Sequence, residues 1–378
     1  QQSALLFGMH MVASNRQPFL NNFYLKSKRS VDKASNEGPA AWVIPAGDPR
    51  PVECAELVRL LQMLGVEVHR ADSAILIAQK QGKEEKKTEF PAGSFVVRMD
   101  QPYSRMADML LDTQYYNAAD TRPYDDTGWS LGALRNVRTV RVTDASILKA
   151  PMSLLSSPHR LEGNLTGAGS TAFLINHNTD NTLATFRFRL REVKMLAAEA
   201  PFRHSGREFN AGSFIIRAEG NPPDLRSAVE QAARESGLTV HAVDEVPKVA
   251  THAVAAPRIA LVHTWGSTQT EGWFRIALDS LRIPYSYISD HVLRDTADLR
   301  ANYDVILFGP VNGSSQRIVN GMPKYGEAIP WKKTDLTPNV GTSPDQTDDI
   351  RGGMGLEGLI NLRKFIDAGG LFITIAGN

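Results

Sequence analysis

The hydrophobic and polar positions of residues 1–111 predict helices that alternate with short buried strands. Residues 1–30 carry an amphipathic pattern typical of one helix, and the polar segment 30–39 that follows is typical of a linker. Gly65 comes directly after a second amphipathic stretch, where a glycine commonly ends a helix. The other elements expected here are strands at 41–45, 66–69 and 95–98, helices at 52–64 and 103–111, and an exposed hairpin or loop at 80–89.

An internal repeat is the most informative feature of the pattern. The segment 89–98, EFPAGSFVVR, recurs at 208–217 as EFNAGSFIIR, with matching hydrophobic strands upstream and helices downstream. We therefore predict a duplicated strand–helix unit in which Phe95 and Phe214 occupy equivalent buried strand positions. The glycine of each Ala-Gly-Ser turn permits a tight entry into the strand. A ligand-binding role for the two turns is the alternative interpretation.

From residue 256 onward the pattern becomes a regular alternation of strands and helices. Strands are expected at 258–263, 285–288, 304–308 and 371–375, and helices at 271–281 and 355–368. Such alternation predicts a parallel, doubly wound sheet, interrupted by the polar insertion 313–353. The expected fold is therefore α/β, with duplicated strand–helix units before a parallel-sheet domain. Its parts are an N-terminal helix at 1–35, repeat regions at 36–150 and 151–255, and the parallel-sheet domain at 256–378.

Composition narrows the class of protein. The 378 residues are 42% hydrophobic and 22% charged, which suits a globular protein of two or three domains and excludes collagen and coiled coil. The formal net charge of +1 gives no reason to expect nucleic acid or an anionic membrane surface as a partner. No apolar run reaches the ~18 residues of a membrane span. The single cysteine, Cys54, excludes a disulfide framework and a zinc site built from cysteines.

Two segments suggest chemistry but have simpler explanations. His159 and Glu162 match the H-x-x-E spacing of several zinc enzymes, yet no third ligand or general base accompanies them, so we expect no catalytic zinc in this chain. The segment 112–151 is rich in aromatic residues and carboxylates, which indicates a long loop packed by its own side chains. Binding of a sugar or peptide by that loop is the alternative.

The parallel-sheet domain offers a better candidate site. His263 ends its first strand and Trp265 follows it, Glu271 opens the next helix, and Asn312 follows a later strand. In open α/β sheets ligands bind at the carboxyl ends of the strands, near the point where the strand order reverses. The structural alternative is that Trp265 and Trp273 pack the helix on the sheet while Glu271 caps its amino end.

The domain at 256–378 resembles the class I glutamine amidotransferase-like fold. The resemblance rests on the alternation itself and on the helix, Asp367-Ala368-Gly369-Gly370 and buried strand that close the sequence. In that family this strand runs into a nucleophile elbow that bears a cysteine. The sequence ends there and its third domain holds no cysteine, so the nucleophile is not carried over and amidotransferase activity is not implied.

A broader resemblance covers nearly the whole chain. The motifs NFYLKSKR at 22–29, AWVIP at 41–45, VRMDQPYSR at 97–105 and PYDDTGW at 123–129 are similar to the region that follows the peptidase domain in large bacterial zinc carboxypeptidase-like proteins. The chain opens with Gln1 and stops as a strand finishes, so we expect an internal fragment of a longer polypeptide, incomplete at its C-terminus. Residues 1–35 would then be the last helix of the upstream peptidase domain.

The resemblance implies a non-catalytic accessory region of an exported, periplasmic or secreted protein. Zinc and the catalytic residues would belong to the upstream peptidase domain, which would also be the partner of this region. Support of that peptidase, and binding of a peptide or carbohydrate ligand, are the expected roles. The alternative is a ligand-binding or hydrolytic amidotransferase-like module centred on His263, Trp265 and Glu271.

Overall fold

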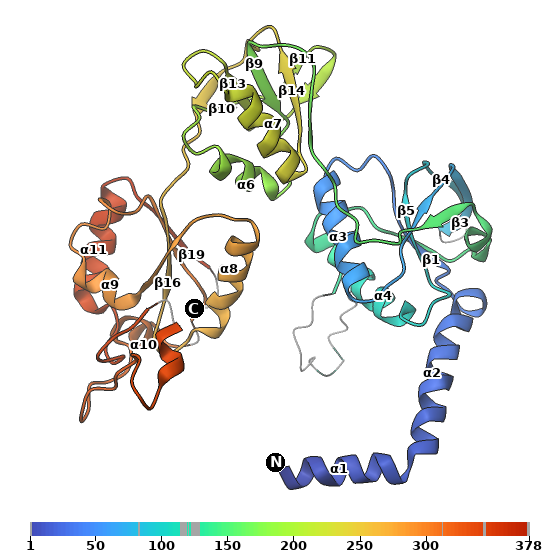
Figure 1. The fold of residues 1–378 in the computed structure, drawn as a ribbon, viewed down its shortest axis with the longest axis horizontal. Helices are drawn as coiled ribbons and strands as arrows, with labels where there is room; N and C mark the ends of the chain where they lie inside the picture. The colour runs from blue at the N-terminus through green and yellow to red at the C-terminus, as the bar shows by residue number, and fades with distance from the viewer. Residues whose placement is uncertain are drawn as a thin grey trace. The chain divides into compact units, whose positions relative to one another are not determined.

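The computed structural model describes residues 2–81, 84–113, 119, 121, 129–311, 313–342 and 345–375 (Figure 1). The chain divides into two compact units, Gln1–Gly163 with Asn178–Asp180, and Asn164–His177 with Asn181–Asn378. The fold is mixed α/β with several sheets, one of which is parallel.

The N-terminal region forms two helices rather than the single helix expected at 1–30. Helix α1 spans Gln2–Ser14 and α2 spans Arg16–Asn36. Pro18 explains the interruption, because a proline has no N–H to donate and its ring clashes with the carbonyl four residues earlier. The expected linker at 30–39 is also wrong over most of its length, since α2 continues to Asn36 and buries Ser30 and Ala34.

The first unit is built on an antiparallel sheet in the order β6-β1-β5-β2-β7. Its strands are β1 Ala41–Ile44, β2 His69–Ala71, β5 Phe95–Arg98, β6 Val140–Val142 and β7 Met152–Leu154, and a separate hairpin joins β3 Ile75–Gln81 to β4 Glu84–Phe90. The helices are α3 Pro51–Met63, α4 Ser104–Leu111, α5 Leu131–Leu134 and the 3₁₀ turn η1 Ala145–Lys149. The strand expected at 66–69 begins only at His69.

The second unit opens with a six-stranded sheet in the order β15-β10-β13-β9-β14-β8. Its elements are β8 Asn164–Thr166, β9 Ala172–Ile175, α6 Thr182–Arg189, β10 Leu196–Ala198, β11 Phe202–His204, β12 Arg207–Phe209, β13 Phe214–Arg217, α7 Leu225–Ser236, β14 Thr239–Val243 and β15 Thr251–Ala253. Apart from β8, this order repeats that of the first unit, with β14, β9, β13, β10 and β15 in the places of β6, β1, β5, β2 and β7.

The register of the two sheets confirms the predicted structural repeat. Ile44 pairs with Phe95 in the first copy, and Ile175 pairs with Phe214 in the second. The glycines before the strands, Gly93 and Gly212, have φ of 86° and 84°, as the shared turn requires. The two phenylalanines are equivalent in register but not in burial, because Phe214 is 9% exposed whereas Phe95 is only partly buried.

A buried serine repeats the same contacts in both copies. The hydroxyl of Ser94 accepts a hydrogen bond from the backbone N–H of Ala46 at 3.0 Å, and the hydroxyl of Ser213 accepts one from His177 at 3.0 Å. Each serine thereby ties the end of one strand to the turn that opens its neighbour. This contact explains why serine follows glycine in both turns. The shared Ala-Gly-Ser sequence is therefore explained by folding alone, and no bound ligand is needed to explain it.

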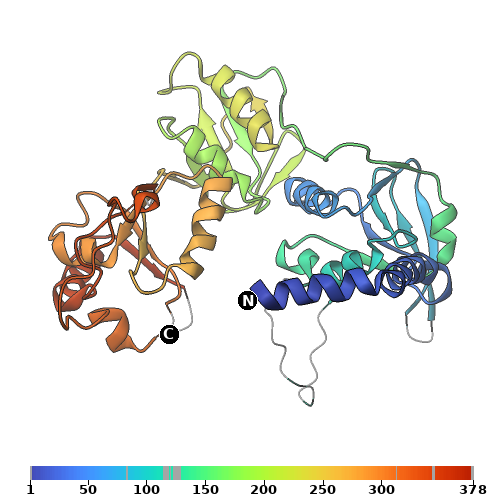
Figure 2. The ribbon, with the colours of Figure 1, turned by 60° about the horizontal axis from the view of Figure 1, so that its bottom comes forward.

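The third region is the parallel sheet that the sequence predicts. Its strands β16 Ile259–His263, β17 Ser286–Ser289, β18 Val305–Phe308 and β19 Leu371–Thr374 lie in the order β17-β16-β18-β19. Helix α8 Gln269–Ser280 covers one face, and α9 Asp290–Asp295 and α11 Gly355–Asp367 cover the other (Figures 1 and 2). Between β18 and α11 lies the predicted insertion, which contains α10 Ser315–Asn320 and the 3₁₀ turn η2 Pro338–Thr342.

Candidate functional site at the carboxyl edge of the parallel sheet

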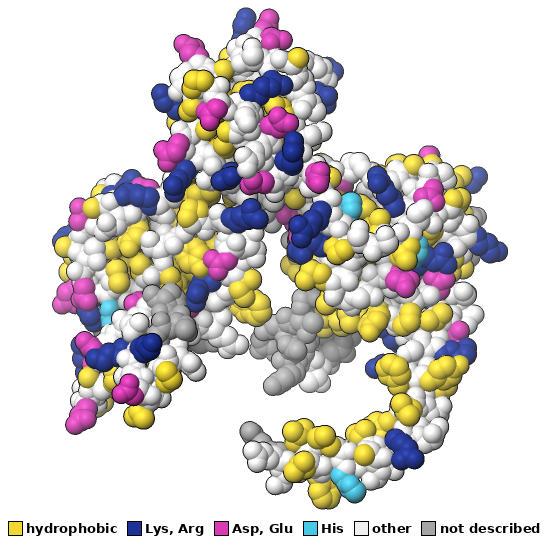
Figure 3. Space-filling view, viewed as in Figure 1, with side chains coloured by type: hydrophobic (Ala, Val, Ile, Leu, Met, Phe, Trp, Pro, Cys, Tyr) yellow, Lys and Arg dark blue, Asp and Glu magenta, His cyan; other side chains and the backbone are white. Residues whose placement is uncertain are grey.

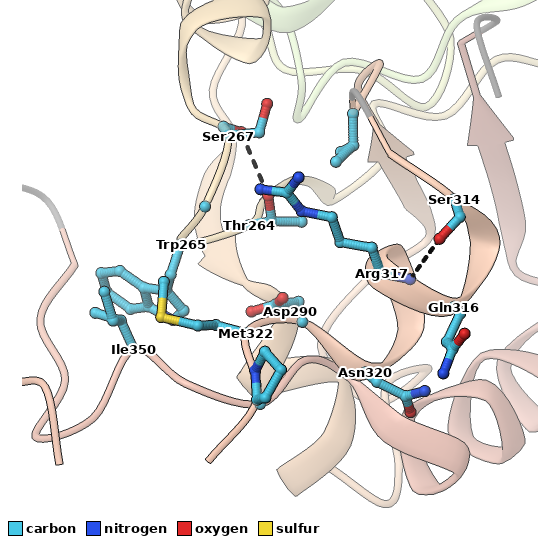
Figure 4. A pocket seen from close by; sticks show the side chains of 15 residues that line it. Thr264, Trp265, Ser267, Asp290, Ser314, Gln316, Arg317, Asn320, Met322 and Ile350 are labelled. Carbon is cyan, nitrogen blue, oxygen red and sulfur yellow. Dashed lines mark hydrogen bonds between the residues drawn. The ribbon is translucent and has the colours of Figure 1, made fainter. Parts of the chain in front are cut away.

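A pocket of about 420 Å³ lies at the carboxyl ends of the parallel strands (Figure 4). Strand β16 has β17 on one side and β18 on the other, so the strand order reverses beside it. The pocket is lined by the segments that leave β16, β17 and β18, by α10 and by part of the insertion. Its lining residues are Thr264, Trp265, Gly266, Ser267, Asp290, Val311, Ser314, Gln316, Arg317, Asn320, Gly321, Met322, Pro323, Ile350 and Gly352.

Below this pocket His263 lies in a stack of aromatic rings. Its imidazole is stacked on Tyr287 with ring centroids 4.4 Å apart, and Trp265 meets it edge-on at 4.8 Å. Its Nε2 lies 3.0 Å from a carboxylate oxygen of Asp345, which belongs to the insertion. Burial lowers the pKa of His263, although the Asp345 carboxylate opposes this effect. The imidazole is therefore favoured in its neutral form, with Nδ1 buried and without a described partner.

Glu271 belongs to the same buried layer. The hydroxyl of Tyr287 donates a hydrogen bond of 2.5 Å to its Oε1, while Oε2 has no partner among the described residues. The guanidinium of Arg275 lies over the Tyr287 ring, 4.5 Å from the centroid. Burial, together with the bond to Glu271, raises the pKa of Tyr287, so its phenol keeps its proton and remains a donor.

Asp290 is the most unusual side chain of the pocket wall. It is 2% exposed, and its Oδ1 lacks a hydrogen-bond partner in the described part of the chain. Burial raises its pKa to about 7, although a backbone hydrogen bond from His291 and the charge of Arg294 act in the opposite direction. An unsatisfied buried carboxyl costs free energy that a ligand donor could recover.

Arg317 supplies the positive charge of the pocket. Its side chain extends across the cavity from α10, and its backbone N–H is held by the hydroxyl of Ser314 at 3.3 Å (Figure 4). In the ranges that the structure covers, no carboxylate forms an ion pair with its guanidinium. The pocket thus combines a guanidinium that has no ion pair in the described structure with a buried carboxyl, one oxygen of which accepts no hydrogen bond and lies 4.0 Å from His291 Nε2.

The sequence-predicted residues are brought together only in part. Trp265 lines the pocket, His263 and Glu271 lie in the buried layer beneath it, and Asn312 lies outside the described residues. The packing alternative is wrong for Trp273, which is 68% exposed. Glu271 lies in the first turn of α8, as that alternative expected, and it also accepts the hydrogen bond from Tyr287. Sequence reasoning missed Asp290, Arg317 and Asp345. Only Asp290 carried a usable signal, as a carboxylate two residues beyond the strand predicted at 285–288.

The other candidates from the sequence form no such site. His159 packs its ring against Phe95 at 4.9 Å, and its proposed partner Glu162 is exposed. Across the described ranges no group of three histidine, cysteine or carboxylate side chains is placed to hold a metal ion. In the aromatic segment 112–151, Tyr115, Tyr116, Tyr124, Asp125 and Asp126 lie outside the described residues. None of the helices described is both long and apolar enough to cross a bilayer.

Unsatisfied buried polar atoms are concentrated at this one place. Atoms of His263, Trp265, Glu271, Arg275 and Asp290 are buried without partners in the described structure. Buried polar groups are normally hydrogen-bonded, so such a cluster beside a cavity is characteristic of a binding site. No family model, curated protein or solved structure matches this chain.

Proposed function

We propose that this chain is the non-catalytic accessory region of a zinc carboxypeptidase-like protein outside the cytoplasm, and that its parallel-sheet domain binds a small polar ligand. The observation that carries the ligand-binding role is the carboxyl-edge pocket with two lining residues, Trp265 and Asp290, that each keep a buried polar atom without a partner in the described structure. The accessory role rests on the sequence resemblance described above. Zinc and the peptidase residues would lie in the upstream domain.

The surface of α1 supports a docking role for the N-terminal helices. None of its residues is buried, and its large apolar side chains range from 46% to 78% exposed, among them Leu5, Phe7 and Val12. Hydrophobic side chains follow α1 and α2 in the space-filling view (Figure 3). An apolar surface of this kind is typical of an interface with another protein domain. We propose that this surface packs against the rest of the upstream peptidase domain, of which residues 1–35 would form the C-terminal helical part.

Binding is favoured over hydrolysis at the pocket. The one cysteine of the chain, Cys54, is buried in the first unit, and burial raises the pKa of its thiol to about 12, which makes it a poor nucleophile. His263 and Glu271, the residues of the hydrolytic alternative, lie beneath the cavity wall instead of lining it. Hydrolysis of a peptide by the purified chain would contradict the accessory role.

A glycine on the pocket wall provides the test. A Cβ added to Gly266 would meet nothing within 4 Å, so Gly266→Leu should fill pocket space without disturbing the fold. Gly272 on α8 is equally open and does not line this pocket, which makes Gly272→Leu the matched control. We expect a library of sugars, sugar acids, amino acids and dipeptides to contain a compound that raises the melting temperature. Gly266→Leu should abolish that shift, and Gly272→Leu should preserve it.

The opposite pattern would refute the site. If every stabilising compound acts equally on the Gly266→Leu variant, the pocket is not where ligands bind. If no compound in the library stabilises the chain, the ligand-binding role itself fails.

A further inference from the structure

We propose that the carboxyl-edge pocket binds a sugar acid, that is, a polyhydroxylated molecule with one carboxylate group. This inference rests on the proposed function and specifies its ligand. Three features of the wall carry it: the guanidinium of Arg317, which has no ion pair in the described structure, the unpartnered Oδ1 of Asp290, and the apolar side formed by Trp265, Met322 and Ile350.

The cation indicates that the ligand carries an anionic group. Arg317 extends into the cavity and has no ion-pair partner among the residues described (Figure 4). A guanidinium presents a rigid fork of N–H donors that matches a carboxylate in a bidentate manner. The nearby hydroxyls of Thr264, Ser267 and Ser314 add neutral hydrogen-bonding groups and no compensating charge.

Asp290 indicates that the same ligand carries hydroxyl groups. Its unpartnered Oδ1 is an acceptor, and the residue lines the pocket although it is almost fully buried. A ligand hydroxyl can pair with this carboxyl whether or not the carboxyl is protonated. A hydroxyl suits this position in both protonation states of the carboxyl, whereas an ammonium would pair only with the ionised one.

The apolar side of the pocket suits the carbon face of a sugar. Trp265, Met322 and Ile350 lie together on the side of the cavity away from Ser314 and Gln316 (Figure 4). Trp265 also contributes an indole N–H that is buried without a described partner. An aromatic side chain with one polar atom can contact the C–H surface of a sugar ring and donate to one of its oxygens. The volume of about 420 Å³ lies in the range of small-molecule sites.

Isothermal titration of the full chain tests the inference, with D-glucuronate as the probe. D-gluconate is an open-chain sugar acid that also has six carbons and one carboxylate, D-glucose lacks the carboxylate, and L-leucine has an ammonium group in place of hydroxyls. We expect D-glucuronate to bind at least about tenfold more tightly than D-glucose, because loss of one charge-assisted pair costs about 1.5–3 kcal/mol. Gluconate binding would show that the ring is dispensable but would keep the ligand class.

Two arginine variants separate a specific pair from general charge attraction. Arg317→Gln should weaken the binding of D-glucuronate at least about tenfold and leave the affinity for D-glucose unchanged. Arg363→Gln removes the same charge from the exposed face of α11, where Arg363 pairs with Asp367, and should change neither affinity. Equal losses in both variants would overturn the assignment of Arg317.

The remaining outcomes distinguish this inference from the proposed function. If L-leucine binds more tightly than D-glucuronate and Gly266→Leu blocks it, the ligand class is wrong but the pocket remains a binding site. If neither sugar acid binds at millimolar concentration, the inference is refuted. The library experiment with Gly266→Leu and Gly272→Leu then decides separately whether the pocket binds anything.

Discussion

Replacing Ser94 and Ser213 with alanine tests the contact that the two repeats share. Both serines are fully buried, and each hydroxyl holds a backbone N–H at 3.0 Å, that of Ala46 in the first copy and that of His177 in the second. The same hydroxyls donate to the carbonyl of Pro91 at 2.7 Å and to the side chain of Asn176 at 3.2 Å. Alanine removes the acceptor and leaves a partly buried N–H unpaired.

Each variant should lower the free energy of local opening by about 1–2 kcal/mol. An unsatisfied buried donor costs about 1–3 kcal/mol, and these N–H groups are only partly buried. A change of that size corresponds to roughly a 5- to 30-fold shift in the opening equilibrium. Ser236→Ala is the control, since Ser236 is also buried but its hydroxyl has no described partner. We expect that variant to be neutral or slightly stabilised.

Hydrogen exchange followed by mass spectrometry is the suitable assay, because a chain with several domains does not unfold in one two-state step. Peptides that cover the ends of β1 and β9 should exchange faster only in the copy that carries the substitution. If Ser94→Ala and Ser213→Ala exchange no faster than Ser236→Ala, the hydroxyl does not stabilise the turn and the reasoning fails.

Two further predictions concern packing and pH. Phe214→Ala should lower the free energy of unfolding by about 3–5 kcal/mol, whereas Phe95→Ala should lower it by less than about 3 kcal/mol because Phe95 is only partly buried. Equal losses of local hydrogen-exchange protection in the two variants would contradict this difference. Burial raises the pKa of Asp290 from 3.8 to about 7, so between these pH values the folded state retains a proton that the unfolded chain releases. Protonation of Asp290 therefore contributes up to about 4 kcal/mol to the free energy of unfolding. This contribution is complete below pH 4 and is lost as the pH rises through 7. Asp290→Asn should flatten that decline in melting temperature measured by tryptophan fluorescence, and parallel pH profiles for the two proteins would refute the assignment.

The local pattern predicted the repeat and the parallel sheet well, because both are encoded in contiguous hydrophobic segments. Strands β1, β5, β16 and β18 begin within one residue of their predicted positions. The strand predicted at 66–69 was misplaced, because Val66 and Val68 are buried by packing before the strand pairing starts. The single N-terminal helix was wrong because amphipathic spacing continues through Pro18, whereas the backbone hydrogen bonding of one continuous helix does not.

The candidate site was predictable in place but not in composition. Its position follows from strand order, which alternation of strands and helices indicates. Its charged groups come from separate parts of the sequence, and Asp345 reaches His263 across 82 positions. Such a contact leaves no periodic signal, since the insertion that carries Asp345 has few hydrophobic positions to fix its path. The burial of His263 and Glu271 beneath the wall likewise depends on how Tyr287 packs between them.

The small hairpin attached to each repeat differs in length between the copies. In the first repeat its strands β3 and β4 have 7 residues each, whereas β11 and β12 in the second have 3 each. The second hairpin turns through Ser205 and Gly206, both with positive φ, as a tight two-residue turn requires. Because the sheet order is unaffected by this difference, the hairpin tip is a natural insertion point. An epitope tag or a fluorescent reporter could be placed between Ser205 and Gly206, neither of which lines the pocket.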